Sequence, residues 1–194
     1  NINKIATLAN ATSYNLEMTK EYINGAPHIK HASLRALYTT LVLQVYDFAK
    51  RYSEKPKVLD LGAGEGSASL PFLKLGARVT AVDVSDSQLN VLRLKCKQFE
   101  SQLEIKCADV NEILETKDEL YDIIVVNSFL HHIPDYNEMI HKAILLLTSH
   151  GQFFSFQEPL RYDTLGFFTR TFNKVAYYSW RIFGGDLIGG IKRY

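Results

Sequence analysis

Residues 58–66 read Val-Leu-Asp-Leu-Gly-Ala-Gly-Glu-Gly, and this stretch decides the fold. Its apolar first half predicts a short strand, and its glycine cluster predicts a tight turn that opens a helix over Glu65–Leu75. Glycine lets a backbone turn sharply and approach a ligand without a Cβ clash. The helix that follows offers free N–H groups at its start. In a parallel α/β sheet, this first turn is where a nucleotide-like cofactor binds.

Strand and helix patterns alternate from this stretch onward. Further strands are expected at 78–83, 103–107, 121–127 and 151–156. The most apolar, 121–127, is predicted to be central and buried on both faces. Helices are expected from Ser85 or Asp86, and from Asp135 to near Ser149. Repeated β-α units predict a Rossmann-like, doubly wound, mostly parallel sheet with helices on both faces.

Three regions of the chain differ in composition and in predicted secondary structure. Residues 1–56 are predicted to form a helical N-terminal lid, because apolar residues recur at helical spacing between Leu34 and Phe48. Residues 57–159 form the predicted α/β core. Residues 160–194 are aromatic and basic, and we expect a helix there that ends near Phe183, before Gly184-Gly185. This helix is expected to cover the core; an apolar substrate wall and a membrane-surface helix are the alternatives.

Composition narrows the classes of function. The 194 residues carry 22 Lys+Arg and 21 Asp+Glu, a net charge of +1, so no nucleic-acid partner is expected. No apolar run has the ~18 residues needed to span a bilayer. The two cysteines, Cys96 and Cys107, form no ligand cluster with histidines, so no metal site is predicted. These features together favour a cytoplasmic location.

The spacing of polar residues after the strands discriminates between cofactors. A dinucleotide fingerprint needs G-x-G-x-x-G, but here the third glycine, Gly66, is one place early and Ser67 stands in its position. Asp83 ends the second strand, 21 residues after Gly62, where a carboxylate can bind both ribose hydroxyls. Asp109 follows the third strand in the same way. The alternative for both carboxylates is to cap the helices that follow them.

These residues carry a resemblance to a known family. The order of the glycine stretch, Val82-Asp83, Ala108-Asp109 and the strand 121–127 resembles class I S-adenosylmethionine-dependent methyltransferases over about residues 56–159. The segment 129–135, Phe-Leu-His-His-Ile-Pro-Asp, is similar to the small-molecule branches of that family.

The resemblance implies S-adenosylmethionine as cofactor, S-adenosylhomocysteine as product, and a set of binding residues. In the methionine half these are Gly62, Ala63 and Gly64 as lining, Asp60 near the ammonium group, and the backbone carbonyl of Asn127. In the adenosine half they are Asp83 with Val84 at the ribose, and Asp109 with the backbone of Ala108 and Val110 at the adenine.

The implied reaction is an in-line displacement at the sulfonium methyl group, in which alignment of the reactants is the main task of the protein. His131 and His132 are the candidate general bases; their alternative is to pack at the turn before Pro134. His28 is a candidate substrate or lid contact, with a loop residue as the alternative. Glu158 follows the last strand and either contacts substrate or ends the strand.

The expected acceptor is a small molecule of phenolic, quinone-like or natural-product type. Amino-group methyltransferases of DNA typically carry Asn-Pro-Pro-Tyr after the fourth strand, whereas residues 127–130 read Asn-Ser-Phe-Leu. Methylation at oxygen, nitrogen or carbon stays open, as does the oligomeric state. A nicotinamide-dependent oxidoreductase, which Ser67 disfavours, and a non-catalytic nucleotide-binding module are the rival functions. The family's sixth and seventh strands have no counterpart here, so the natural C-terminus is expected beyond Tyr194.

Overall fold

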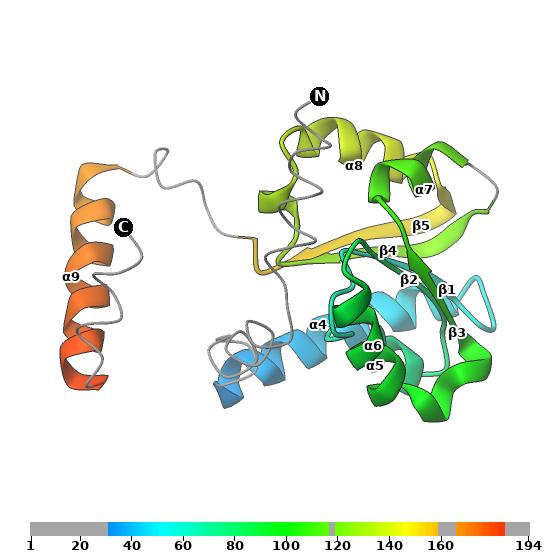
Figure 1. Cartoon of the computed structure of the whole chain (residues 1–194), viewed down its shortest axis with the longest axis horizontal. Helices are drawn as coiled ribbons and strands as arrows, with labels where there is room; N and C mark the ends of the chain where they lie inside the picture. The colour runs from blue at the N-terminus through cyan, green and yellow to red at the C-terminus, as the bar shows by residue number, and fades with distance from the viewer. Residues whose placement is uncertain (1–30, 117–118, 159–165, 185–194) are drawn as a thin grey trace. The chain divides into compact units, whose positions relative to one another are not determined.

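A computed structural model describes residues 31–116, 119–158 and 166–184. It contains one sheet of five parallel strands in the order β3-β2-β1-β4-β5 (Figure 1). The strands are β1 (Lys57–Leu61), β2 (Arg78–Asp83), β3 (Leu103–Cys107), β4 (Tyr121–Asn127) and β5 (Leu147–Phe156). The predicted Rossmann-like α/β fold is therefore confirmed, and all carboxyl ends of the strands meet at one edge of the sheet.

The apolar strand β4 lies between β1 and β5, as its composition predicted. Leu59 of β1 pairs in register with Ile124 of β4, and both side chains are fully buried. Burial on both faces explains why these strands are continuous apolar runs rather than alternating ones.

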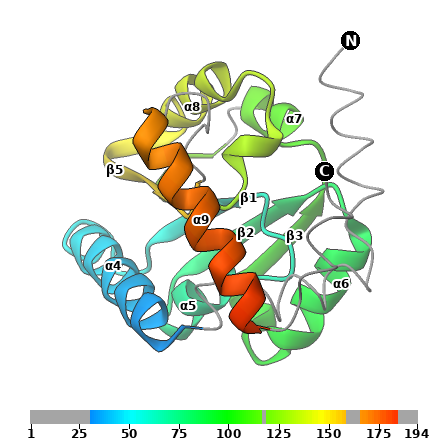
Figure 2. The same ribbon diagram turned by 90° about the vertical axis from the view of Figure 1, so that its left-hand side faces the viewer.

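Helices cover both faces of the sheet (Figure 2). On one face pack α4 (Ala32–Lys50), α5 (Ser69–Lys74) and α6 (Asp86–Lys95), and on the other α7 (Val110–Thr116) and α8 (Tyr136–Ile144). Two 3-10 segments connect these elements: η1 (Lys97–Gln102) lies between α6 and β3 in the chain, and η2 (Leu130–His132) lies between β4 and α8. Phe72 is among the largest fully buried side chains of the first face. Its burial is worth about 2–3 kcal/mol.

The predicted N-terminal helical region is represented by α4. The Tyr38 ring lies tilted against that of Phe156, with ring centroids 4.8 Å apart, and the Gln152 amide donates to the carbonyl of Val45 at 2.9 Å. Both contacts fasten α4 to β5. Residues 1–30 of the predicted lid, including His28, lie outside the described residues.

Two predicted element boundaries are wrong. The helix expected from Glu65 starts only at Ser69, because Gly66 adopts a left-handed φ of +88° and prolongs the turn. An added Cβ on Gly66 would lie 2.9 Å from Leu92 of α6, so only glycine fits there. The helix expected to reach Ser149 ends at Ile144. The strand expected from 151 starts already at Leu147, and its register with β4 shifts between Tyr121 and Ile123.

Residues 159–194 form a second compact unit, separate from residues 1–158. Its described part is α9 (Phe167–Gly184), and this helix ends at the glycine that the sequence predicted. Phe167, Phe168 and Phe172 are each more than 70% exposed. None of the helices in the described residues is long and apolar enough to cross a membrane.

Candidate functional site

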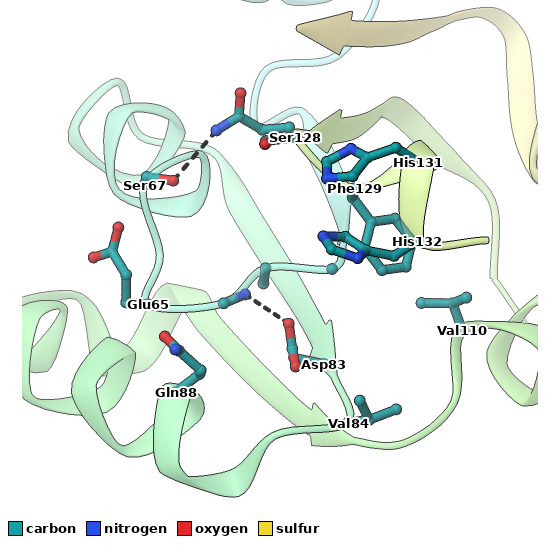
Figure 3. A pocket seen from close by; sticks show the side chains of 14 residues that line it. Glu65, Ser67, Asp83, Val84, Gln88, Val110, Ser128, Phe129, His131 and His132 are labelled. Carbon is teal, nitrogen blue, oxygen red and sulfur yellow. Dashed lines mark hydrogen bonds between the residues drawn. The ribbon is translucent and has the colours of Figure 1, made fainter. Parts of the chain in front are cut away.

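A pocket lies at the carboxyl edge of the sheet, over the ends of β1, β2 and β4 (Figure 3). Its empty volume is about 830 Å³, including space open to solvent. The lining residues are Gly62, Ala63, Gly64, Glu65, Ser67, Asp83, Val84, Gln88, Val110, Asn127, Ser128, Phe129, His131 and His132.

The glycine turn after β1 forms one wall of the pocket. The N–H groups of Gly62 and Ala63 both donate to the carbonyl of Val82 at 2.9 Å, which ties the turn to β2. Gly62 has a φ of +73°, and an added Cβ would lie 2.1 Å from the ring of Phe129. Glycine is therefore required at position 62 both by its backbone conformation and by the approach of the Phe129 ring.

Asp83 lies beside this turn at the end of β2. One carboxylate oxygen accepts the N–H of Gly64 at 2.8 Å, and the other accepts the N–H of Ser85 at 2.8 Å. Burial raises the pKa of Asp83 above its ordinary value, although the hydrogen bonds from Ser85, Gly64 and Val84 oppose that shift. A carboxylate has about four lone-pair positions, so Asp83 retains capacity for hydroxyl donors in the pocket.

Below the glycine turn, Asp60 is almost completely buried. Ser69 of α5 donates its hydroxyl to one carboxylate oxygen at 2.6 Å, while the other oxygen has no hydrogen-bond partner. Burial raises the pKa of Asp60 to about 7; the Ser69 hydrogen bond opposes this shift and the nearby charge of Asp83 adds to it. Asn127 behaves similarly: its amide nitrogen donates to Ser67 at 3.3 Å, and its buried amide oxygen has no partner.

The segment after β4 forms the opposite wall. Ser128 has a left-handed φ of +55°, a conformation that non-glycine residues rarely adopt and that is associated with functional sites. It turns the chain so that Phe129, His131 and His132 line the pocket. The two imidazole rings lie with centroids 4.0 Å apart (Figure 3). Burial, and then the neighbouring His131, lower the pKa of His132 to about 4, so this ring is neutral near pH 7.

Most of the predicted site residues are brought together in this pocket. Those that line it are Gly62, Ala63, Gly64, Asp83, Val84, Val110, Asn127, His131 and His132. Asp60, Ala108, Asp109 and Glu158 do not line it. One oxygen of Asp109 accepts both the backbone N–H of Asn111, at 2.8 Å, and its side-chain amide, at 2.9 Å, which is the helix-capping alternative.

The sequence analysis missed several lining residues. Gln88 enters from the first turns of α6, and Glu65 is buried beside an ion-pair partner, Lys95. Ser128 and Phe129 follow Asn127, a predicted site residue, in the sequence. The sequence did not predict that the turn at Ser128 brings the Phe129 ring against Gly62. No spacing signal identifies Gln88. Across the described ranges, no group of three or more His, Cys, Asp or Glu side chains is arranged to hold a metal ion.

Comparison with known proteins agrees with this geometry. Residues 58–151 match the family model described as a methyltransferase domain. The fold also resembles that of monomeric WbdD, with a TM-score of 0.55 at 21% identity over 66% of this chain and 32% of that one. A SAM-dependent methyltransferase from Agrobacterium tumefaciens has a TM-score of 0.53 at 17% identity, over 64% of this chain and 46% of its own. These matches support the resemblance of residues 58–151 to class I S-adenosylmethionine-dependent methyltransferases.

Part of the chain is also similar in sequence to curated O-methyltransferases. A ubiquinone biosynthesis O-methyltransferase from Coxiella burnetii is 36% identical over 97 residues, which are 50% of this chain and 41% of the relative. The protein of that name from Pelagibacter ubique is 32% identical over 114 residues, 57% of this chain and 47% of the relative. The chain thus spans less than half the length of the curated relatives that it matches.

Proposed function

We propose that this protein transfers a methyl group from S-adenosylmethionine to a hydroxyl group of a small phenolic or quinone-like acceptor. The observation that carries the proposal is the arrangement of the pocket. A buried carboxylate and a glycine turn form one wall, and two imidazoles form the facing wall. The names of the relatives favour oxygen as the methylated atom.

The residues of the pocket fit this cofactor. Asp83 has acceptor capacity for ribose hydroxyls, and Val84 and Val110 offer apolar surface beside it. The unpartnered buried amide oxygen of Asn127 is an acceptor suited to the methionine ammonium group, in addition to the predicted role of the Asn127 backbone carbonyl. Asp60 stays a predicted neighbour of that ammonium group, although it does not line the pocket. Asp109, with Ala108, stays a predicted adenine contact.

When bound, the cofactor supplies a methyl group on a positively charged sulfur, a leaving group that needs no protonation. The tasks left to the protein are to align the acceptor oxygen with the methyl carbon, to exclude water and to accept the proton of the hydroxyl. Phe129, Val84 and Val110 give the pocket apolar surface for an aromatic ring. A neutral imidazole is the usual group that takes the proton, and such a base contributes about 10²- to 10⁴-fold in rate.

Calorimetric titration of the protein with S-adenosylmethionine, S-adenosylhomocysteine and NAD tests the cofactor. We expect the first two to bind and NAD not to bind. Transfer of a labelled methyl group to a panel of catechols, matched with the same rings lacking hydroxyl groups, then tests the acceptor. Binding of NAD alone would favour the oxidoreductase, and cofactor binding without transfer to any hydroxyl would contradict the proposed acceptor class.

A further inference from the structure

Glu158, which follows β5 by two residues, reaches across to the segment after β4. One of its carboxylate oxygens accepts the backbone N–H groups of Phe129, at 2.8 Å, and Leu130, at 3.0 Å. The other lies 3.1 Å from Nδ1 of His131 and accepts the N–H of that residue at 3.4 Å. One side chain therefore holds three consecutive backbone N–H groups and one imidazole of the pocket wall.

The backbone is strained directly after both β4 and β5. Gln157, just before Glu158, has a φ of +59°, and Ser128, at the end of β4, has a φ of +55°. These are the only non-glycine residues with positive φ among the described residues. The N–H of Ser128 donates to the carbonyl of Phe156 at 2.9 Å, so the two strained corners are joined. Such conformations persist only where surrounding contacts enforce them, and they concentrate at functional sites.

The hydrogen bond between Glu158 and His131 determines the protonation of the imidazole. Burial by itself raises the pKa of Glu158, but the hydrogen bonds from His131, Phe129 and Leu130 outweigh burial and hold the pKa below its ordinary value. The carboxyl group is therefore ionised near pH 7, and an ionised carboxylate can only accept hydrogen bonds. Nδ1 of His131 must then carry the proton, which leaves the lone pair of a neutral ring on Nε2.

The two histidines are consequently not equivalent. Both line the pocket, but His131 has a carboxylate that fixes its ring, whereas the pKa of His132 is lowered to about 4 by burial and then by the neighbouring His131. A base that forms a cation during the reaction is stabilised by an adjacent carboxylate. His131 has that partner at 3.1 Å.

We propose that Glu158 is a positioning residue: it holds the segment Phe129–His131 at the pocket and fixes His131 with Nε2 as the proton acceptor. This inference rests on the proposed function. The acceptor O–H proton moves to Nε2 as the oxygen–methyl bond forms and the sulfur–methyl bond breaks. The imidazolium, paired with Glu158, then releases the proton to solvent, so the net products are methylated acceptor, S-adenosylhomocysteine and one proton.

Nitrogen-15 NMR of the imidazole side chains tests the positioning without any turnover. In the wild-type protein we expect His131 to be protonated at Nδ1 and unprotonated at Nε2. In Glu158→Gln, the amide can accept or donate, so the fixed tautomer is lost. Glu100→Gln, which neutralises an exposed glutamate, serves as the matched control and leaves the His131 signals unchanged. A wild-type His131 protonated at Nε2 overturns the proposal.

Kinetics separate positioning from a merely structural role. Glu158→Gln is expected to lower kcat about 10²-fold, the low end of the range for a general base, while KM for S-adenosylmethionine stays within about twofold. Because Glu158 acts through His131, adding Glu158→Gln to a His131→Asn protein should cost no further activity. Glu158→Asp keeps the charge and should recover part of kcat. Additive losses in the double variant would refute positioning through His131.

The outcomes distinguish the two proposals. If the wild-type protein methylates no hydroxyl acceptor, the proposed function fails, while the NMR spectra still decide whether Glu158 fixes His131. If the protein is active and Glu158→Gln has the kcat of Glu100→Gln, the positioning role fails and the proposed function stands. A Glu158→Gln protein that melts far below the control is replaced by Glu158→Asp in the same spectra, where the Nδ1-protonated tautomer must persist.

Discussion

Asp60 makes the stability of this protein depend on pH in a way that one substitution isolates. Its buried carboxyl has a pKa raised from an ordinary 3.8 to about 7, chiefly by burial. Between these values the folded state keeps a proton that the unfolded chain has lost. The free energy of unfolding therefore falls as pH rises, by about 1.36 kcal/mol per unit. The slope falls as pH approaches 7, where half of the carboxyl groups have lost the proton, so the loss from pH 5 to pH 7 is about 2.3 kcal/mol, and it levels off above pH 7.

Asp60→Asn removes the titration and retains a side chain of similar shape, to which Ser69 can still donate its hydroxyl. The amide places a donor where the unpartnered oxygen lies, which costs stability equally at every pH. The absolute stabilities of the two proteins therefore differ for two reasons. Only the change of their difference with pH reports the proton on Asp60.

Urea unfolding of both proteins at pH 5, 6, 7 and 8 measures this difference. His132 titrates in an overlapping range with the opposite sign: its pKa is lowered to about 4, so its contribution to stability grows as pH rises toward 6.5. That contribution is present in both proteins and cancels in the difference. We expect the wild type to lose about 2.3 kcal/mol relative to Asp60→Asn between pH 5 and pH 7. Parallel pH profiles would refute a raised pKa at Asp60.

Three further predictions concern the pocket. Asp83→Asn should weaken S-adenosylmethionine binding by about 1.5–3 kcal/mol, roughly 10- to 150-fold in Kd by calorimetry, because an amide nitrogen replaces one acceptor oxygen; an unchanged Kd would remove Asp83 from the cofactor site. Gly62→Ala should lower the free energy of unfolding by about 2–5 kcal/mol through its positive φ and its clash with Phe129. In a Phe129→Ala background the clash is gone and about 1–2 kcal/mol should remain, so an equal loss in both backgrounds contradicts this reasoning. Proton NMR should show His132 titrating near pH 4, and an ordinary midpoint near pH 6.5 would mean that its ring is solvated.

The fold was largely predictable because its signals are local. The apolar run 121–127 and the glycine turn at Gly62 each depend on a few adjacent residues, and parallel topology brings their ends to one edge. The start of α5 was mispredicted because the conformation of Gly66 depends on a contact with Leu92, 26 residues away. The approach of Phe129 to Gly62, and of Glu158 to His131, are likewise contacts between separate strand ends. The spacing of residues in the sequence does not predict side-chain contacts between the ends of separate strands.

The sequence did not distinguish a ligand-binding role from a helix-capping role for Asp83 and Asp109. Each follows a strand of the sheet and precedes a helix, so both have the same local pattern. In the structure Ser85, not Asp83, caps α6, because its hydroxyl accepts the N–H of Gln88. One oxygen of Asp83 accepts the N–H of Ser85, and the other faces the glycine turn and the pocket. Asp109 directs one oxygen to two groups of Asn111 and lies outside the pocket lining. Because Ser85 caps α6, Asp83 can face the pocket, whereas Asp109 itself accepts hydrogen bonds at the start of α7. The residues that follow each carboxylate therefore decide which of the two roles it has.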